Sequence, residues 1–326
     1  MVSVPVTTLN YVNPVQEYIP LVEARMREQS NGHHPDLQTA LDHLLNSGGK
    51  RIRPTITLLV GEMIDADHER VITLAAAVEL LHTATLVHDD VIDGSLLRRG
   101  TPTLNARWSP GATILTGDFI FARAAKLAAE TGSIDVMNLF AKTLSTIVNG
   151  EITQLFKSKG LASREDYFRR IYAKTASMFE LAALAPLYLS DSSDAELEAM
   201  RRFGYEIGMA FQIIDDILDF TSEQKDIGKP VANDLRQGLI TLPALYFFEE
   251  NPEDNYVQAI LVGERLREEE LRELVNLIQS SGVIDKALGE AFAYTKRGLK
   301  SLEVMPAGVE KQALIELTDF IVSRQI

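Results

Sequence analysis

A helical pattern of apolar residues runs through nearly the whole chain and limits the folds that it can adopt. Alanine and leucine recur at helical spacing, and alternating strand-like runs are hard to find. Residues that begin helices precede many of these runs: Asn13-Pro14, Pro35, Ser109-Pro110, Ser133 and Ser163. We expect helices near residues 14–30, 35–46, 52–65, 69–93, 110–131, 134–157, 164–189, 193–221, 240–250, 267–280, 282–301 and 307–324.

The sequence shows no boundary that would divide it into domains. No proline- or glycine-rich linker interrupts the 326 residues, and no repeat period indicates a solenoid. A helix of 20 residues spans about 30 Å, so several of the expected helices could run the full depth of one domain. We therefore predict a single all-α domain over residues 1–326.

Composition and charge exclude several classes of function. A net charge of −14 argues against general nucleic-acid binding, which needs a basic surface. The absence of cysteine excludes disulfides, thiolate metal sites and cysteine nucleophiles. The N-terminus lacks the pattern of a signal peptide, and no apolar run approaches the roughly 18 residues of a membrane span. We expect a cytoplasmic protein that meets a membrane only at its surface.

Two Asp-Asp-x-x-Asp motifs follow apolar helical runs. The first is Asp89, Asp90 and Asp93, and the second is Asp215, Asp216 and Asp219. Residues four apart share a helix face, where like charges cost about 0.2–0.5 kcal/mol per pair. Magnesium, which prefers a few carboxylates together with substrate phosphates and water, would relieve this repulsion. One motif would equally fit a solvated charged face, but two copies of the same spacing predict magnesium held against a diphosphate.

Basic residues lie close to the aspartate motifs in the sequence. They form three clusters: Gly48-Gly49-Lys50-Arg51-Ile52-Arg53, then Arg98-Arg99-Gly100, then Lys225 with Lys229. Arginine and lysine are the natural ligands of a diphosphate. In an acidic protein, such clusters indicate a local anion site, and the alternative is that they only pair with the aspartates.

In combination, these motifs resemble those of the trans-type polyprenyl diphosphate synthases. The resemblance extends from Gly49 to about Ala244, and no major motif is missing. It rests on Gly49-Lys50-Arg51-x-Arg53-Pro54, His82 with the first aspartate motif, Arg98-Arg99-Gly100, Gly150-Glu151-x-x-Gln154, Lys174-Thr175, and Phe211-Gln212 with the second motif. It implies a helical bundle of about a dozen helices around a central cavity, of the isoprenoid synthase type, usually as a homodimer.

The resemblance also implies an activity. An allylic diphosphate would bind both aspartate motifs through three Mg²⁺ ions and ionise to an allylic cation and pyrophosphate. Isopentenyl diphosphate would then attack the cation and lose a proton, which lengthens the chain by one trans isoprene unit. Released pyrophosphate can accept that proton, so no strong protein base is expected, and His88 is interpreted as an ordinary helix residue.

The same resemblance implies the roles of individual residues. Isopentenyl diphosphate would bind Lys50, Arg53, His82 and Arg99, whereas the allylic diphosphate would face Arg98, Lys174, Gln212 and Lys229. Thr175 and Gln212, with Lys174 beside them, would act at the developing cation. All six motif aspartates would hold metal.

Small residues ahead of the first motif indicate product length. Ala84 and Thr85 lie about one turn below the predicted metal site, with Leu81 deeper on the same face. Since an aromatic side chain there would close a product tunnel, these residues predict a product longer than geranylgeranyl. The alternative is a plug from another helix, with Phe140 and Ile147 as candidates.

Other classes of protein fit less well. A short-chain farnesyl or geranylgeranyl synthase remains an alternative on product length. A terpene cyclase usually has a different second metal motif and needs no pocket for isopentenyl diphosphate. A di-iron bundle would need two Glu-x-x-His pairs, and only Glu79 with His82 matches. A silent subunit of a heteromeric synthase generally loses motif aspartates, which are all present here.

Overall fold

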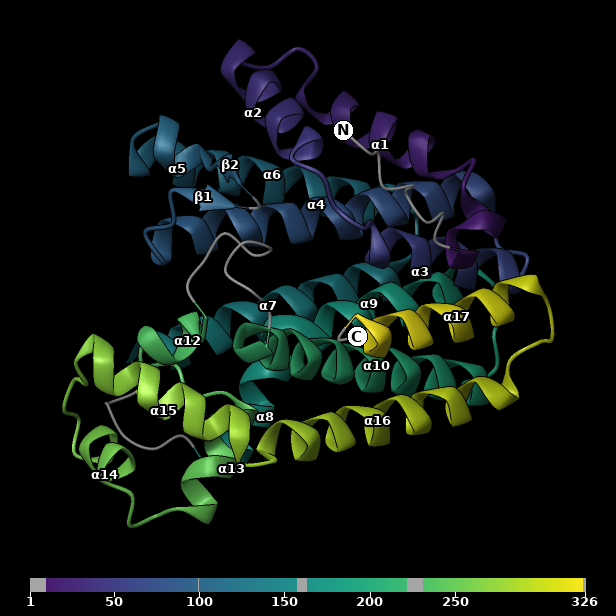
Figure 1. Cartoon of the computed structure of the whole chain (residues 1–326). Helices are drawn as coiled ribbons and strands as arrows, with labels where there is room; N and C mark the ends of the chain where they lie inside the picture. Colours follow the sequence, from purple (N-terminus) through teal and green to yellow (C-terminus); the bar gives the residue numbers. More distant parts are fainter. Residues whose placement is uncertain (1–9, 99, 157–162, 222–230, 325–326) are drawn as a thin grey trace, which may run out of the picture. The chain divides into compact units, whose positions relative to one another are not determined.

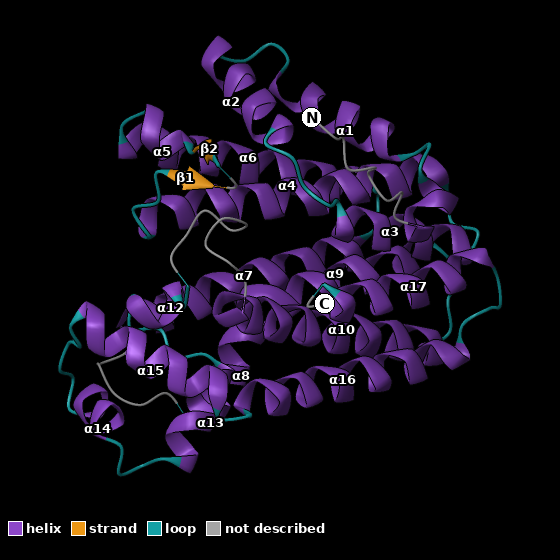
Figure 2. Ribbon diagram, in the orientation of Figure 1, coloured by secondary structure: helices purple, strands orange, loops and turns teal. Residues whose placement is uncertain are grey.

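Helices account for most of the described structure. The computed structural model describes residues 10–98, 100–156, 163–221 and 231–324. Within these ranges, the one sheet is a short antiparallel hairpin of β1 (Leu97–Arg98) and β2 (Thr101–Pro102), in which Leu97 pairs with Pro102 (Figure 2). The predicted all-α class is confirmed.

The chain forms two compact units, and each unit is assembled from distant segments. Unit 1 comprises Met1–Ala141, Leu181–Arg201 and Ser301–Phe320. Unit 2 comprises Lys142–Glu180, Arg202–Lys300 and Ile321–Ile326. Because the chain returns repeatedly to each unit, no linker marks the division in the sequence, and the single domain stays a prediction.

Unit 1 is organised around one long buried helix. Its elements are η1 (Asn10–Val15), α1 (Ile19–Arg27), η2 (Glu28–Ser30), α2 (Pro35–Asn46), α3 (Ile52–Met63), α4 (His68–Ile92), the hairpin, α5 (Leu104–Arg107), α6 (Pro110–Glu130), η4 (Ala185–Leu189) and η5 (Leu302–Val304). Helix α4 packs against α6, α3 and α1 (Figure 1). Leu74, Val78 and Leu81 are fully buried on it, and each contributes about 1.5–3 kcal/mol.

Helix α4 is apolar on nearly every side. By length and composition it is the one helix among the described residues that could cross a membrane, but 72% of its most apolar window is buried inside the structure. A core helix of a globular protein has the same profile, so a single helix of this kind is a weak sign of a membrane span.

Unit 2 has its own apolar core. Its elements are α8 (Arg164–Ile171), the π-helical turn η3 (Tyr172–Ala176), α12 (Asn233–Arg236), α13 (Leu242–Glu250), α14 (Asn255–Leu261) and α15 (Glu268–Ser280). Five further helices have residues in both units: α7 (Ile134–Phe156), α9 (Ser177–Leu184), α10 (Asp194–Thr221), α16 (Val283–Ser301) and α17 (Val309–Ser323). Buried side chains of α8, α10, α13, α15 and α16 form one continuous cluster.

Most expected helices are present, but the helix expected over 14–30 is wrong as a single element, because Asn13 and Pro14 lie inside η1 and α1 begins only at Ile19. Ser109 caps α6, and Ser163 forms a capping box with Asp166 at the start of α8. The helix expected over 164–189 is wrong as a single element, because the π-helical turn and a 3₁₀ turn that contains Pro186 interrupt it. The hairpin, α5, α12 and α14 were not expected.

Candidate active site

The first aspartate motif lies at the C-terminal end of α4. Asp89 and Asp90 occupy its last turn and Asp93 is its C-cap, where the helix dipole adds partial negative charge. Asp90 is 5% exposed, and its Oδ1 lies 2.8 Å from Nη2 and 3.0 Å from Nε of Arg98. Asp93 is exposed and Asp89 is half-buried. Arg98 therefore holds the middle carboxylate inside unit 1, while solvent reaches the outer two.

The second aspartate motif lies near the C-terminal end of α10 and repeats this division. Asp216 is 4% exposed. Its Oδ2 accepts a hydrogen bond from the Tyr167 hydroxyl at 2.8 Å, and its Oδ1 accepts one from Gln212 Nε2 at 2.8 Å. Burial raises the pKa of Asp216 to about 7, against the opposing effect of the hydrogen bonds from Gln212 and Tyr167. The middle aspartate is again a buried, hydrogen-bonded group.

The outer aspartates of the second motif are half-buried and have different partners. Asp215 Oδ1 lies 2.9 Å from Nη2 of Arg324, which follows the end of α17. Asp219 accepts hydrogen bonds from the backbone N–H groups of Asn233 at 3.1 Å and Asp234 at 3.0 Å, at the start of α12. Asp219 thereby connects the end of α10 to the next described helix.

The donor atoms of both motifs are carboxylate oxygens, which suit a hard divalent cation such as magnesium. Among the described residues, no three His, Asp or Glu side chains lie close enough together to hold an ion by themselves. Magnesium characteristically keeps several waters and binds through one or two carboxylates together with substrate phosphates. The residues therefore fit an ion whose coordination is completed by a phosphorylated ligand and water.

Lys174 and Thr175 lie on the π-helical turn η3, a local widening that often marks functional sites. Thr175 donates a hydrogen bond of 2.5 Å from its hydroxyl to Gln212 Oε1, so the two residues predicted to act at the cation are in contact. Because Gln212 also donates to Asp216, a continuous chain of hydrogen bonds runs from Thr175 to the second motif. Lys174 Nζ pairs with Glu151 Oε1 at 3.1 Å.

Two glycines allow neighbouring helices to approach this turn closely. A Cβ atom at Gly150 of α7 would lie 2.5 Å from Ala173 Cβ. A Cβ atom at Gly208 of α10 would lie 2.5 Å from the backbone Cα of Ala176. No side chain fits at either position without a shift, so both glycines fix the distance between η3 and the helices that carry Glu151 and Gln212.

The basic loop before α3 lies in unit 1, as does His82. Lys50 is exposed, and its Nζ lies 4.9 Å from the ring centre of Phe320. Arg53, on the first turn of α3, and His82, on α4, are half-buried. Arg51, between the two predicted ligands, adopts a left-handed backbone conformation with φ of 47°. Arg99, Lys225 and Lys229 lie outside the described residues.

The residues predicted to set product length differ in burial. Ala84 and Leu81 are fully buried on α4, whereas Thr85 is half-buried and donates a hydrogen bond to the His82 carbonyl at 2.7 Å. The alternative plug residues, Phe140 and Ile147, are also buried.

Sequence reasoning missed several residues that hold the site together. Tyr167 and Arg324 carry no local sequence signal, because their partners are 49 and 109 positions away. Glu79, considered only for a di-iron motif, binds Arg51 instead. His88 Nε2 lies 3.1 Å from the Ile114 carbonyl, in a notch that Gly117 leaves open, which agrees with its interpretation as a structural residue.

The chain belongs to the polyprenyl synthetase family, whose model matches residues 34–278. This result confirms the family predicted from the motifs.

Among curated proteins, the all-trans-nonaprenyl-diphosphate synthase (geranyl-diphosphate specific) of Rhodobacter capsulatus is 37% identical over 86% of this chain and 87% of its own length. Heptaprenyl diphosphate synthase component 2 of Bacillus subtilis is 32% identical over 94% of this chain and 88% of its own length. Among solved structures, the polyprenyl synthase from Caulobacter crescentus, complexed with calcium and isoprenyl diphosphate, has a TM-score of 0.91 at 35% identity, and the match covers 97% of this chain and 98% of that one.

Proposed function

We propose that this protein condenses isopentenyl diphosphate with an allylic diphosphate repeatedly, so that each round lengthens the chain by one isoprene unit before an all-trans polyprenyl diphosphate is released. The observation that carries this proposal is the pair of intact aspartate motifs, each at the C-terminal end of a largely buried helix, in a chain of the polyprenyl synthetase family. The names of the relatives, which include a nonaprenyl and a heptaprenyl synthase component, support the same reaction class.

As the resemblance to the family implies, the allylic diphosphate binds the aspartate motifs through magnesium. Asp89, Asp93, Asp215 and Asp219 are the ligands of the magnesium ions, and the buried Asp90 and Asp216 orient the helix ends that carry them. Bound magnesium supplies positive charge that stabilises the departing pyrophosphate. Arg98, Lys174 and Lys229 add positive charge on the same substrate. The calcium in the Caulobacter structure supports a divalent site, and the number of three ions remains a prediction.

The reaction then proceeds by cleavage of a C–O bond, formation of a C–C bond and loss of a proton. The C1–O bond of the allylic substrate breaks, and its electron pair leaves with pyrophosphate. The Thr175 hydroxyl and the Gln212 amide oxygen are the dipoles that stabilise the cation. The double bond of isopentenyl diphosphate, held by Lys50, Arg53, His82 and Arg99, attacks that carbon. A proton from the new chain passes to pyrophosphate and restores a double bond.

The product is longer than geranylgeranyl diphosphate. Ala84 and Thr85 are small, and Ala77, two turns earlier on the same face of α4, is small as well. A growing chain that passes this face meets no aromatic side chain on it. The geranyl-specific nonaprenyl synthase of Rhodobacter capsulatus, as a 37% identical relative, supports a long product.

The active form is a homodimer. Large apolar side chains stay exposed on two helices: Ile114 and Leu115 on α6, and Val148, Ile152, Leu155 and Phe156 on α7. Residues 148, 152 and 155 recur at helical spacing, so they form one apolar face. A second copy of this chain would cover it. Analytical ultracentrifugation should give a dimer mass, and Ile152→Lys should shift it toward the monomer.

The decisive experiment incubates the purified chain alone with farnesyl diphosphate, isopentenyl diphosphate and magnesium, followed by chromatography of the products. We expect products longer than geranylgeranyl, and loss of turnover with a chelator that added magnesium restores. Mainly geranylgeranyl product would overturn the long-chain assignment. No turnover without a partner protein would instead favour a subunit of a heteromeric synthase, as the name of the Bacillus component suggests for that relative.

A further inference from the structure

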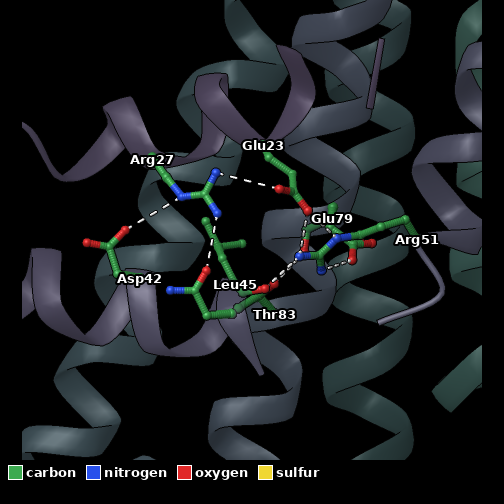
Figure 3. Close-up of polar contacts among 8 residues, drawn as sticks. Glu23, Arg27, Asp42, Leu45, Arg51, Glu79 and Thr83 are labelled. Carbon is green, nitrogen blue, oxygen red and sulfur yellow. Dashed lines mark hydrogen bonds and ion pairs between the residues drawn. The ribbon is translucent and has the colours of Figure 1, made fainter. Parts of the chain in front are cut away.

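Arg51 connects the basic loop to three separate segments of unit 1. Its Nε and Nη2 each lie 3.0 Å from Glu23 Oε1 on α1, and its Nη1 lies 3.0 Å from Glu79 Oε1 on α4 (Figure 3). Nη2 also donates a hydrogen bond of 2.9 Å to the carbonyl of Leu45 near the end of α2. All three nitrogens of the guanidinium group are therefore engaged, which fixes its position and its rotation.

The contacts of Arg51 are poorly accessible to solvent. The side chains of Arg51 and Glu79 are 14% and 7% exposed, and that of Glu23 is 27% exposed. An ion pair in such surroundings is screened little by salt, and removal of one partner leaves the other as a buried charge. Lysine, with a single nitrogen, cannot reproduce these contacts.

The backbone of Arg51 is fixed as firmly as its side chain. Arg51 is the N-cap of α3 in a left-handed conformation, with φ of 47° and ψ of 33°. Its carbonyl accepts hydrogen bonds from the backbone N–H of Thr55 at 3.0 Å and from the Thr55 hydroxyl at 2.8 Å. Arginine rarely adopts this conformation, so the surrounding contacts must hold it.

Arg51 lies next to the residues assigned to isopentenyl diphosphate, although it is not one of them. Lys50 precedes it and Arg53 follows two residues later, so its conformation sets the directions of both side chains. Its partner Glu79 lies one turn of α4 before His82. The Arg51–Glu79 pair thus links the two segments that carry three of the residues assigned to isopentenyl diphosphate.

We propose that Arg51 is a positioning residue for the isopentenyl diphosphate pocket: it clamps the loop of Lys50 and Arg53 to α1, α2 and α4 and thereby presents these cations, together with His82, to one diphosphate. This inference rests on the proposed function. Arg51 itself touches no substrate, because its guanidinium group is occupied by Glu23, Glu79 and Leu45.

The test uses Arg51→Asn, because asparagine tolerates a left-handed backbone better than most residues and leaves the loop geometry accessible. We expect KM for isopentenyl diphosphate to rise about tenfold or more, since misplaced binding groups lose much of their effect, with KM for farnesyl diphosphate changed less than about twofold. Arg51→Lys should recover part of the loss. Glu79→Gln should raise the same KM, and the double variant should be no worse than Arg51→Asn, because the two residues act as a unit.

Arg27 provides a matched control within the same cluster. Its Nη1 lies 3.5 Å from Glu23 Oε2 and its Nε lies 3.6 Å from Asp42 Oδ1. Among the residues drawn in Figure 3, it makes no contact with Arg51. Arg27→Ala should leave both KM values unchanged. If Arg51→Asn lowers the melting temperature but leaves KM for isopentenyl diphosphate at the wild-type value, Arg51 has only a structural role and the inference fails.

Lys50→Ala and Arg53→Ala separate this inference from the proposed function. If both raise KM for isopentenyl diphosphate and Arg51→Asn does not, the pocket is correctly assigned and only the clamp is wrong. If neither changes that KM, the assignment of the pocket itself fails, and with it the basis of the clamp.

Discussion

Tyr167 donates a hydrogen bond of 2.8 Å to Asp216, and both side chains are buried in unit 2. The hydroxyl occupies one oxygen of the middle carboxylate, and the Gln212 amide occupies the other. Asp216 is therefore engaged on both sides by protein donors. It connects α8, which carries Tyr167, to the helix end that carries Asp215 and Asp219.

Tyr167→Phe should destabilise the protein and slow its reaction. The change leaves a buried carboxylate oxygen without its donor, which costs about 1–3 kcal/mol of unfolding free energy. Because Asp216 shares Gln212 with Thr175, we expect kcat to fall while KM for isopentenyl diphosphate stays near the wild-type value. Thermal unfolding and steady-state kinetics measure the two effects.

Tyr256→Phe is the matched control for this substitution. Tyr256 also donates its hydroxyl to a carboxylate, that of Glu273, but at the surface of unit 2. Its loss should leave the stability of the protein almost unchanged, because the contact is exposed to solvent. Equal effects of Tyr256→Phe and Tyr167→Phe would show that burial of the Asp216 contact is irrelevant.

Asp216 should make the metal-free protein less stable as the pH rises. Burial raises its pKa from 3.8 to about 7 in the folded state. A group whose folded pKa is raised contributes its full stability below the unfolded pKa and loses it as pH rises through the folded value. A shift of this size corresponds to about 4 kcal/mol. Between pH 4 and 7, in a chelator, the difference in unfolding free energy between wild type and Asp216→Asn should therefore move in favour of the variant. If the difference in unfolding free energy stays constant across this range, the raised pKa of Asp216 is wrong.

The sequence predicted the local features of the site, such as helix starts and motifs, better than the features that depend on tertiary packing. Helix starts at Ser109 and Ser163 and the aspartate motifs are local patterns, which sequence spacing reports directly. No local sequence pattern predicts the π-helical turn around Lys174, nor the close approach of α7 and α10 to it at Gly150 and Gly208, which is a matter of tertiary packing.

The sequence also could not predict which charged residues pair with each other. The partner of Arg51 is 28 residues away at Glu79, and the partner of Asp215 is 109 residues away at Arg324. No helical or strand period connects such positions. The sequence could therefore identify charged motifs but not which of their members are buried, and all six aspartates were predicted as equal metal ligands. Asp90 and Asp216 differ from the others because they are 5% and 4% exposed.

Gly208→Ala should damage both packing and catalysis. The new Cβ would lie 2.5 Å from Ala176 Cα, and a backbone atom cannot rotate away, so we expect a loss of about 1–3 kcal/mol. Since Thr175 precedes Ala176 and Gln212 lies one turn after Gly208, the shift should stretch their 2.5 Å hydrogen bond and lower kcat. Gly289→Ala, in α16 with no atom within 4 Å of the added Cβ, should instead stabilise the protein by about 0.5–1 kcal/mol. Calorimetry measures the unfolding stability of both variants. If Gly289→Ala is destabilised as well, the loss in Gly208→Ala cannot be attributed to the contact with Ala176.

Ala84→Phe should shorten the product without unfolding the protein. Ala84 is fully buried, so in a closed core the added ring would cost about 1–3 kcal/mol by overpacking. Beside a product tunnel, the ring would fill space that the growing chain otherwise occupies, and the melting temperature would change little. Ala77 lies on the same face roughly 10 Å further from the aspartate motif, so Ala77→Phe should give products of intermediate length.

Ala75 is the control for both phenylalanine variants. It is also fully buried on α4, but nine residues from Ala84, which places it about 180° around the helix. Ala75→Phe should therefore destabilise the protein and leave the length of any product unchanged. The order of product lengths, with Ala84→Phe shortest, Ala77→Phe next and wild type longest, is a molecular ruler along one helix face. If Ala84→Phe and Ala75→Phe destabilise equally and neither shortens the product, the chain does not grow along that face, and a plug such as Phe140 or Ile147 must set its length.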